Sequence, residues 1–214
     1  MTPDSHTPFI LASGSMTRRR LLRDSGHFFA AIPADVDESA IKYECLRKGQ
    51  SPDGIARTLA EAKARHVSTL QPDQLILAAD QVLALGTTML DKPTGRHGLG
   101  RHLEQLSGQV HHLVNGVILM RGGAILWSYI DRCEMEMRVL SAADQDRYVR
   151  EAPDEALQSV GGYRIEAEGI HLFRRMAADW SSILGLPLLP VLAALRDAGV
   201  GWPEVGRSGE TSDG

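Results

Sequence analysis

One aspartate and two lysines have the residue types and spacing to act on a polyphosphate. Asp80 directly follows the apolar run Leu75–Ala79, which predicts a strand covered on both faces. We therefore expect Asp80 at the carboxyl end of that strand, where open α/β sheets bind ligands. Lys63 belongs to the helix predicted just before it, and Lys92 follows the next predicted strand. Two ammonium groups and a divalent cation beside one carboxylate would neutralise phosphate charge during phosphoryl chemistry. Each lysine taken singly is also compatible with a solvated surface charge, and Asp80 with a cap or turn.

A turn of small residues near the N-terminus is a second candidate for phosphate binding. Ser13-Gly14-Ser15 joins a strand predicted at Phe9–Ala12 to a helix predicted at Thr17–Asp24. Backbone N–H groups at a helix N-terminus favour anions. Arg18, one helical turn in, could add a bidentate phosphate contact. Ser13, Ser15 and Arg18 are therefore candidate substrate-binding residues, although serine and glycine also make ordinary turns.

The elements that must position these residues alternate along the chain. Ser51 and Pro52 start the helix predicted over Asp53–Leu70, and Ser141 with Asp144 forms a predicted capping box. Asp35, Asp37 and Glu38 form an acidic cluster expected in a loop. The other predicted elements are strands at Phe28–Ile32, Met89–Leu90, Leu113–Met120 and Ile125–Ile130, a hairpin turn at 121–123, and helices at 93–107, 142–152 and Pro187–Ala198. This order indicates an α/β fold with a mixed sheet, in one domain over residues 1–200 and a flexible tail at 201–214.

Composition excludes several other classes of protein. The chain has 214 residues, 43% of them hydrophobic, and a net charge of -4, which disfavours disorder and nucleic-acid coating. It has no apolar run of membrane-spanning length, and its N-terminus is unlike a signal peptide. Cys45 and Cys133 form no metal or redox motif and favour a reducing cytoplasm, with a single disulfide left open. Walker and dinucleotide-binding loops, histidine pairs with zinc spacing and a nucleophile elbow are absent. Of the 23 basic residues only four are lysines, namely Lys42, Lys48, Lys63 and Lys92.

An ordered set of short motifs resembles the Maf family of nucleoside triphosphate pyrophosphatases over about residues 9–200. The matching segments are Leu11–Ser15 with Arg18, Asp35–Glu38, Leu59–Ala64, Ala79–Val82, Lys92-Pro93, Leu106–Gly108, Gly161–Tyr163 and Gly185–Pro187. The resemblance implies an elongated, twisted mixed sheet with flanking helices and a cleft between two lobes, as in inosine triphosphatases. It also implies a cytoplasmic enzyme, often a homodimer, that uses Mg²⁺ or Mn²⁺ to cleave a nucleoside triphosphate into monophosphate and pyrophosphate.

The resemblance also implies roles for individual residues. Asp80 matches the general base, which lies close to the metal, and Asp37 matches an acidic residue of the metal cluster. The residues that match positions lining the triphosphate cleft are Ser13, Arg18, Lys63 and Lys92.

Two departures from the family pattern bear on the base and on catalysis. Met16 and Thr17 replace the usual proline and first arginine after the serine motif. Gln81 and Glu166 resemble the subgroup of 7-methyl-GTP pyrophosphatases rather than the dTTP and UTP type. Carboxylates and carboxamides offer a base different donors and acceptors, so the preferred base stays open.

Two alternatives to the pyrophosphatase remain. A nucleotide-binding regulator of cell division with weak or vestigial catalysis would explain the lost proline and arginine. A phosphatase with Asp80 as covalent nucleophile is disfavoured, because Val82 breaks the Asp-x-Asp pattern that it needs.

Overall fold

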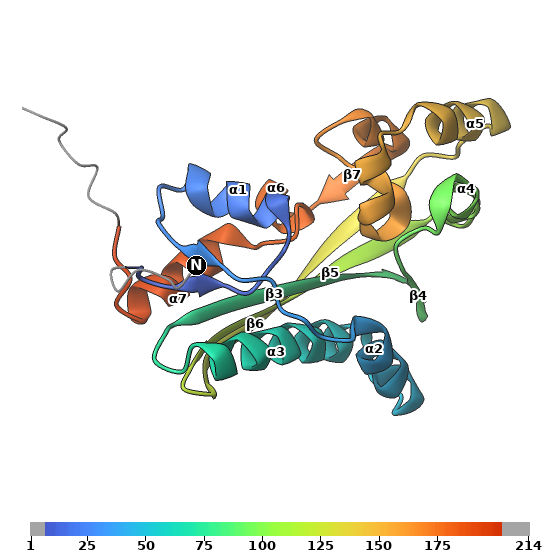
Figure 1. Ribbon diagram of the computed structural model, residues 1–214. Coiled ribbons are helices and arrows are strands. Elements are labelled where there is room, and N and C mark those ends of the chain that lie inside the picture. Colours follow the sequence, from blue (N-terminus) through green and yellow to red (C-terminus); the bar gives the residue numbers. More distant parts are fainter. Residues whose placement is uncertain (1–6, 203–214) are drawn as a thin grey trace, which may run out of the picture.

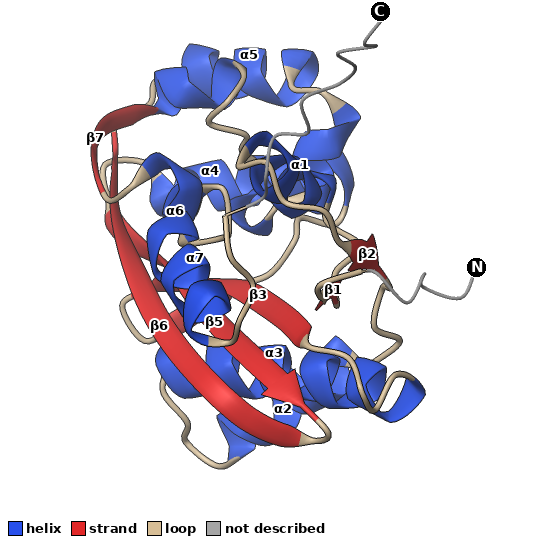
Figure 2. Cartoon of the chain, turned by 90° about the vertical axis from the view of Figure 1, so that its left-hand side faces the viewer, coloured by secondary structure: helices blue, strands red, loops and turns tan. Residues whose placement is uncertain are grey.

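A computed structural model describes residues 7–202 of the chain. Within them one mixed sheet has the strand order β2-β1-β3-β5-β6-β7, with β4 attached to β3 (Figures 1 and 2). β1 runs parallel to β2 and β3, and all other pairs are antiparallel. The strands are β1 (Ile10–Leu11), β2 (Ala30–Ala31), β3 (Ile76–Leu85), β4 (Thr88–Leu90), β5 (Val110–Arg121), β6 (Ala124–Met137) and β7 (Phe173–Ala177). The predicted mixed α/β fold is confirmed.

Helices cover both faces of this elongated, curled sheet. The helices α2 (Glu38–Arg47) and α3 (Pro52–Leu70) lie on one face, and α1 (Met16–Asp24), α6 (Trp180–Ile183) and α7 (Leu188–Asp197) lie on the other (Figure 1). The far end of β5 and β6 carries a second group of helices. They are α4 (Gly95–Leu106), α5 (Ala142–Glu151) and three short 3₁₀ helices at Asp154–Gln158, Val160–Gly162 and Glu168–Leu172. The α4–α5 group encloses one buried apolar cluster, and α1 and α7 enclose another. These two clusters give the molecule two lobes.

Helix α3 rests unusually close to the sheet at Gly116. This glycine is paired in register with Asp80 across β3 and β5. A Cβ atom at Gly116 would lie 2.3 Å from the carbonyl oxygen of Ala56 in α3. The missing side chain therefore sets how near α3, and every side chain it presents, can come to Asp80.

Most of the predicted helices and the hairpin are confirmed. Ser51 and Ser141 cap α3 and α5 as expected, and Ser141 and Asp144 form the complete capping box. Gly122 and Gly123 make the turn between β5 and β6. Cys45 and Cys133 are free and buried, so the alternative of a disulfide is wrong. No helix of residues 7–202 is long and apolar enough to span a membrane.

Two predictions of local structure are wrong, and two short elements were not predicted. β3 does not end at Asp80 but continues to Leu85, because Val82, Leu83 and Ala84 are buried and pair with β5. The acidic cluster is not all loop, since Asp37 caps α2 and Glu38 is its first residue. The short elements β7 and α6 had no periodic apolar pattern to reveal them. The tail predicted at 201–214 lies almost entirely outside the described residues.

Candidate active site

A break in the edge of the sheet creates the candidate site. β1 pairs only with the start of β3, at Ile76 and Leu77, and β4 pairs only with its end, from Leu83 to Leu85. The residues of β3 between these two partners have no strand on that edge within the described chain. A cavity of about 610 Å³ opens beside this gap. Eight of the nine predicted site residues line it, namely Ser13, Ser15, Arg18, Lys63, Asp80, Gln81, Lys92 and Glu166.

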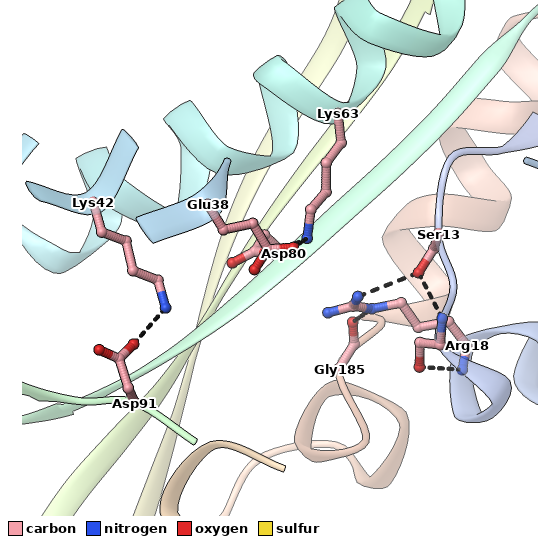
Figure 3. A network of polar contacts seen from close by, with 9 residues as sticks. Ser13, Arg18, Glu38, Lys42, Lys63, Asp80, Asp91 and Gly185 are labelled. Carbon is pink, nitrogen blue, oxygen red and sulfur yellow. Dashed lines mark hydrogen bonds and ion pairs between the residues drawn. The ribbon is translucent and has the colours of Figure 1, made fainter. Parts of the chain in front are cut away.

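One buried charged group of the cavity is a lysine held by two carboxylates. Lys63 reaches from α3 and its ammonium donates to Asp80 Oδ1 of β3 and, at 2.8 Å, to Glu38 Oε1 of α2 (Figure 3). Lys63 is 9% and Asp80 5% exposed. A buried carboxylate needs such a partner, since leaving it unpaired would be costly. The second oxygen of each carboxylate has no protein partner in the described chain and is free to bind something else.

Glu38 stays ionised in this arrangement. Burial alone would raise the pKa of its carboxyl group, but the hydrogen bond and charge of Lys63, with the charges of Lys92 and Lys42, more than offset burial. The pKa therefore lies below its ordinary value of 4.5. Glu38 was not among the predicted site residues, although it follows Asp37 directly.

The serine turn and Arg18 form the opposite wall of the cavity. Ser15 caps α1 by accepting from the Arg18 N–H at 3.3 Å, and Ser13 accepts from the Ser15 N–H at 3.2 Å. The Arg18 guanidinium donates to the Gly185 carbonyl at 2.7 Å (Figure 3). Burial lowers the pKa of Arg18, which the Asp80 and Glu38 carboxylates oppose, and an arginine stays protonated through such shifts. A fixed cation therefore faces Asp80 across the cavity.

A smaller recess of about 70 Å³ adjoins the cavity and is lined mainly by uncharged residues. Gln81 and Glu166 line both spaces. The Gln81 Nε2 donates to Asn115 Oδ1 at 3.1 Å and to the Ile183 carbonyl at 3.1 Å, which leaves its Oε1 as an acceptor. Glu166 pairs with Arg164 at 3.0 Å. The recess can therefore offer acceptor oxygens to a flat polar ring.

Met16 and Thr17, which replace the usual proline and arginine of the serine motif, lie together at the start of α1 beside the cavity. Met16 begins α1, is 68% exposed and lines the mouth of the cavity, whereas Thr17 lines both the cavity and the recess. Neither carries charge. Arg18 is therefore the cation that this turn contributes to the cavity.

Asp37 is the one predicted site residue that the structure does not bring to the cavity wall. Its carboxylate accepts from the Ala40 N–H at 2.9 Å and caps α2. Lys42, which had no predicted role, does line the cavity, while Lys48 does not. The spacing of Glu38 and Lys42, four residues apart on one helix, places both on the same face and was the signal that could have found Lys42.

The residues present fit a divalent cation that also binds a phosphate substrate. Residues 7–202 hold no group of three or more histidine, cysteine, aspartate or glutamate side chains that could enclose an ion. Mg²⁺, however, is usually held by one or two carboxylates together with substrate phosphates and water. Asp80 and Glu38, which share one ammonium and each keep a free oxygen, meet that requirement.

Comparison with known proteins identifies the family. The model of the family described as "Maf-like protein" matches residues 8–198. The chain belongs to the Maf family. A "7-methyl-GTP pyrophosphatase" of Mesorhizobium japonicum is 44% identical over 89% of this chain and 96% of that protein. A protein of the same name from Rhizobium etli is 40% identical over 93% and 98%.

One further curated protein and one solved structure are similar to this chain. A "Nucleoside triphosphate pyrophosphatase" of Nitrobacter hamburgensis is 45% identical over 90% of this chain and 95% of that protein. The solved structure of a HAM1 protein from Coxiella burnetii matches with a TM-score of 0.38 and 18% identity, over 61% of this chain and 73% of that chain. The sequence matches support the predicted resemblance to the Maf family and to its 7-methyl-GTP subgroup.

Proposed function

We propose that this protein hydrolyses nucleoside triphosphates to the monophosphate and pyrophosphate, with 7-methyl-GTP as the leading candidate substrate. The observation that carries the proposal is the Lys63 ammonium held between Asp80 and Glu38 in a cavity with Arg18 on its opposite wall. The 7-methyl-GTP and nucleoside triphosphate pyrophosphatases that resemble this chain over nearly its whole length support the same reaction.

In the proposed reaction Asp80 is the general base. Its carboxylate orients a water molecule and takes its proton as the water oxygen attacks the α-phosphorus. The bond from the α-phosphorus to the bridging oxygen breaks, and pyrophosphate leaves with the electron pair of that bond. Lys63 keeps the Asp80 carboxylate oriented, since its ammonium binds one of the two oxygens and thereby fixes the direction of the other. General base catalysis of this kind contributes about 10²–10⁴-fold.

The pyrophosphate leaving group requires cations that are not already paired with carboxylates. Arg18 and Lys92 line the cavity and have no carboxylate partner in the described chain. An arginine fork and a lysine point charge both bind phosphate oxygens well. These two residues are therefore assigned to the charge that develops on pyrophosphate as the bond breaks.

Mg²⁺ or Mn²⁺ is the proposed cofactor. Asp80 and Glu38 would hold it, and the resemblance adds Asp37 as a further acidic candidate. The ion would supply charge neutralisation and polarisation of the phosphoryl oxygens. Homodimer formation and a cytoplasmic location are also proposals that the family resemblance suggests.

The recess beside Gln81 and Glu166 is the proposed site for the base. A guanine edge presents N–H donors, which carboxylate and amide oxygens accept. A guanine methylated at N7 also carries positive charge on its ring, so the carboxylate of Glu166 favours it further. The pyrimidine of dTTP or UTP presents a single N–H donor on that edge and no positive charge.

A panel of normal and methylated nucleoside triphosphates, each with Mg²⁺ and with Mn²⁺, tests the proposal. Monophosphate and pyrophosphate should appear, and Asp80→Asn should lower kcat by about 10²–10⁴-fold. Asp53→Asn is a suitable control, since Asp53 pairs with Arg132 of β6 and does not line the cavity. Orthophosphate as the first product would contradict the proposed reaction. Tight binding without turnover of any substrate would favour the regulator of cell division.

A further inference from the structure

Lys42 occupies a position in the cavity that the proposed reaction does not yet use. It lies on α2 one helical turn after Glu38 and points toward the segment that follows β4 (Figure 3). There its ammonium pairs with Asp91, the residue before Lys92. The Lys42 side chain is only 19% exposed, whereas that of Asp91 is 71% exposed. Lys42 therefore reaches inward while its partner lies at the rim.

The ion pairs of the cavity show which of its cations are available to bind phosphate. Lys63 is already occupied by Asp80 and Glu38, and Arg164 by Glu166. Among the cations that line the described cavity, this leaves Arg18 and Lys92 for a triphosphate with about four negative charges. Lys42 is the remaining lining cation, and its present partner Asp91 is not part of the lining.

We propose that Lys42 is a third phosphate-binding cation. When the substrate binds, the Lys42 ammonium releases Asp91 and pairs with the terminal phosphates instead. This assignment rests on the proposed function. An ion pair with so exposed a carboxylate contributes little to stability and is weakened by solvent. A phosphate offers more charge and more acceptor oxygens than Asp91. Lys42 on α2 and Lys92 in the segment after β4 line the same cavity, so both can reach a phosphate group that binds there.

The test measures binding of inorganic pyrophosphate by calorimetry to the wild-type chain and to Lys42→Gln. Loss of one charge-assisted hydrogen bond predicts a Kd about 10-fold higher in this variant. Lys48→Gln is the matched control, since Lys48 is an exposed residue at the end of the same helix and outside the cavity. Asp91→Asn should lower the Kd, because the ammonium then has no competing carboxylate. Lys42→Arg should bind nearly as the wild type does.

Kinetics locate the contact on the substrate. Lys42→Gln should raise KM by about 10-fold with kcat within about twofold, and should leave inhibition by the nucleoside monophosphate unchanged. Equal affinity for pyrophosphate in Lys42→Gln and Lys48→Gln would overturn the assignment. Failure of the wild type to release pyrophosphate from any substrate would instead contradict the proposed function, and the calorimetric comparison would still decide the role of Lys42.

Discussion

Replacement of Gly116 by alanine should damage both stability and catalysis, although this residue touches no substrate. The added Cβ would lie 2.3 Å from the Ala56 carbonyl oxygen and 2.7 Å from the Arg57 nitrogen. Both distances are about 1 Å shorter than ordinary van der Waals contact. The obstructing atoms are helix backbone, which cannot turn aside as a side chain can. Helix α3 must therefore retreat from the sheet.

The size of both effects follows from this displacement. Overpacking of a closely packed contact costs about 1–3 kcal/mol. For a chain of this length each kcal/mol lowers Tm by about 2–4 °C, so we expect a decrease of up to about 12 °C. Lys63 lies two helical turns after Ala56 on the same helix and moves with it. A misplacement of about 1 Å at a catalytic group can cost about 10²-fold in rate.

The assay pairs thermal unfolding with continuous detection of pyrophosphate release. Gly100→Ala is the matched control, because its added Cβ would meet only the Val149 side chain, at 3.8 Å. Alanine within helix α4 should raise stability by about 0.5–1 kcal/mol and leave kcat unchanged. An unchanged Tm and kcat in Gly116→Ala would refute the claim that this contact sets the distance from Lys63 to Asp80.

Two further predictions concern acid stability and the base. His111 is buried, with Nε2 bound to the Tyr163 hydroxyl and Nδ1 without a partner, and burial together with the charge of His112 lowers its pKa from 6.5 to about 4. Between pH 6.5 and about pH 4, His111 therefore binds a proton in the unfolded chain but not in the folded chain. Urea unfolding should show about 3 kcal/mol lost across that window, and a pH-independent free energy of unfolding there would contradict this. Glu166→Gln should lower kcat/KM for 7-methyl-GTP relative to UTP by about 10-fold, whereas Glu155→Gln, which lies outside the recess, should not alter that ratio.

Helices with a local start signal could be predicted from the sequence because their caps need only neighbouring residues. Ser51 with Pro52 and Ser141 with Asp144 satisfy backbone groups within one turn. Helix α2 has a local cap as well, at Asp37, but lacks the apolar pattern that would have identified it as a helix. One side of it faces the cavity through Glu38 and Lys42, and Cys45 is its one buried residue. An apolar stripe was therefore missing.

Eight residues that line the candidate site were predicted from the sequence, whereas Glu38, Lys42 and the geometry of the site were not. Asp80 interrupts an apolar run, which is typical of a strand end, yet here a polar side chain faces a cavity from the middle of β3. That the cavity lies where β1 and β4 fail to meet is a property of pairing between distant segments. Glu38, and not the predicted Asp37, is the acidic residue of this segment that lines the cavity and pairs with Lys63. The spacing of the two residues could not reveal this, because it depends on Asp37 turning its carboxylate back to cap α2.

Isotope labelling of the products tests the central claim most directly. Hydrolysis of 7-methyl-GTP in ¹⁸O-labelled water with Mg²⁺, followed by mass spectrometry, shows which phosphorus the water attacks. Attack at the α-phosphorus, activated by Asp80, predicts one ¹⁸O atom in the monophosphate and none in pyrophosphate, with product formed about 10²–10⁴-fold more slowly by Asp80→Asn. Label in pyrophosphate, release of orthophosphate, or full activity of Asp80→Asn would contradict it.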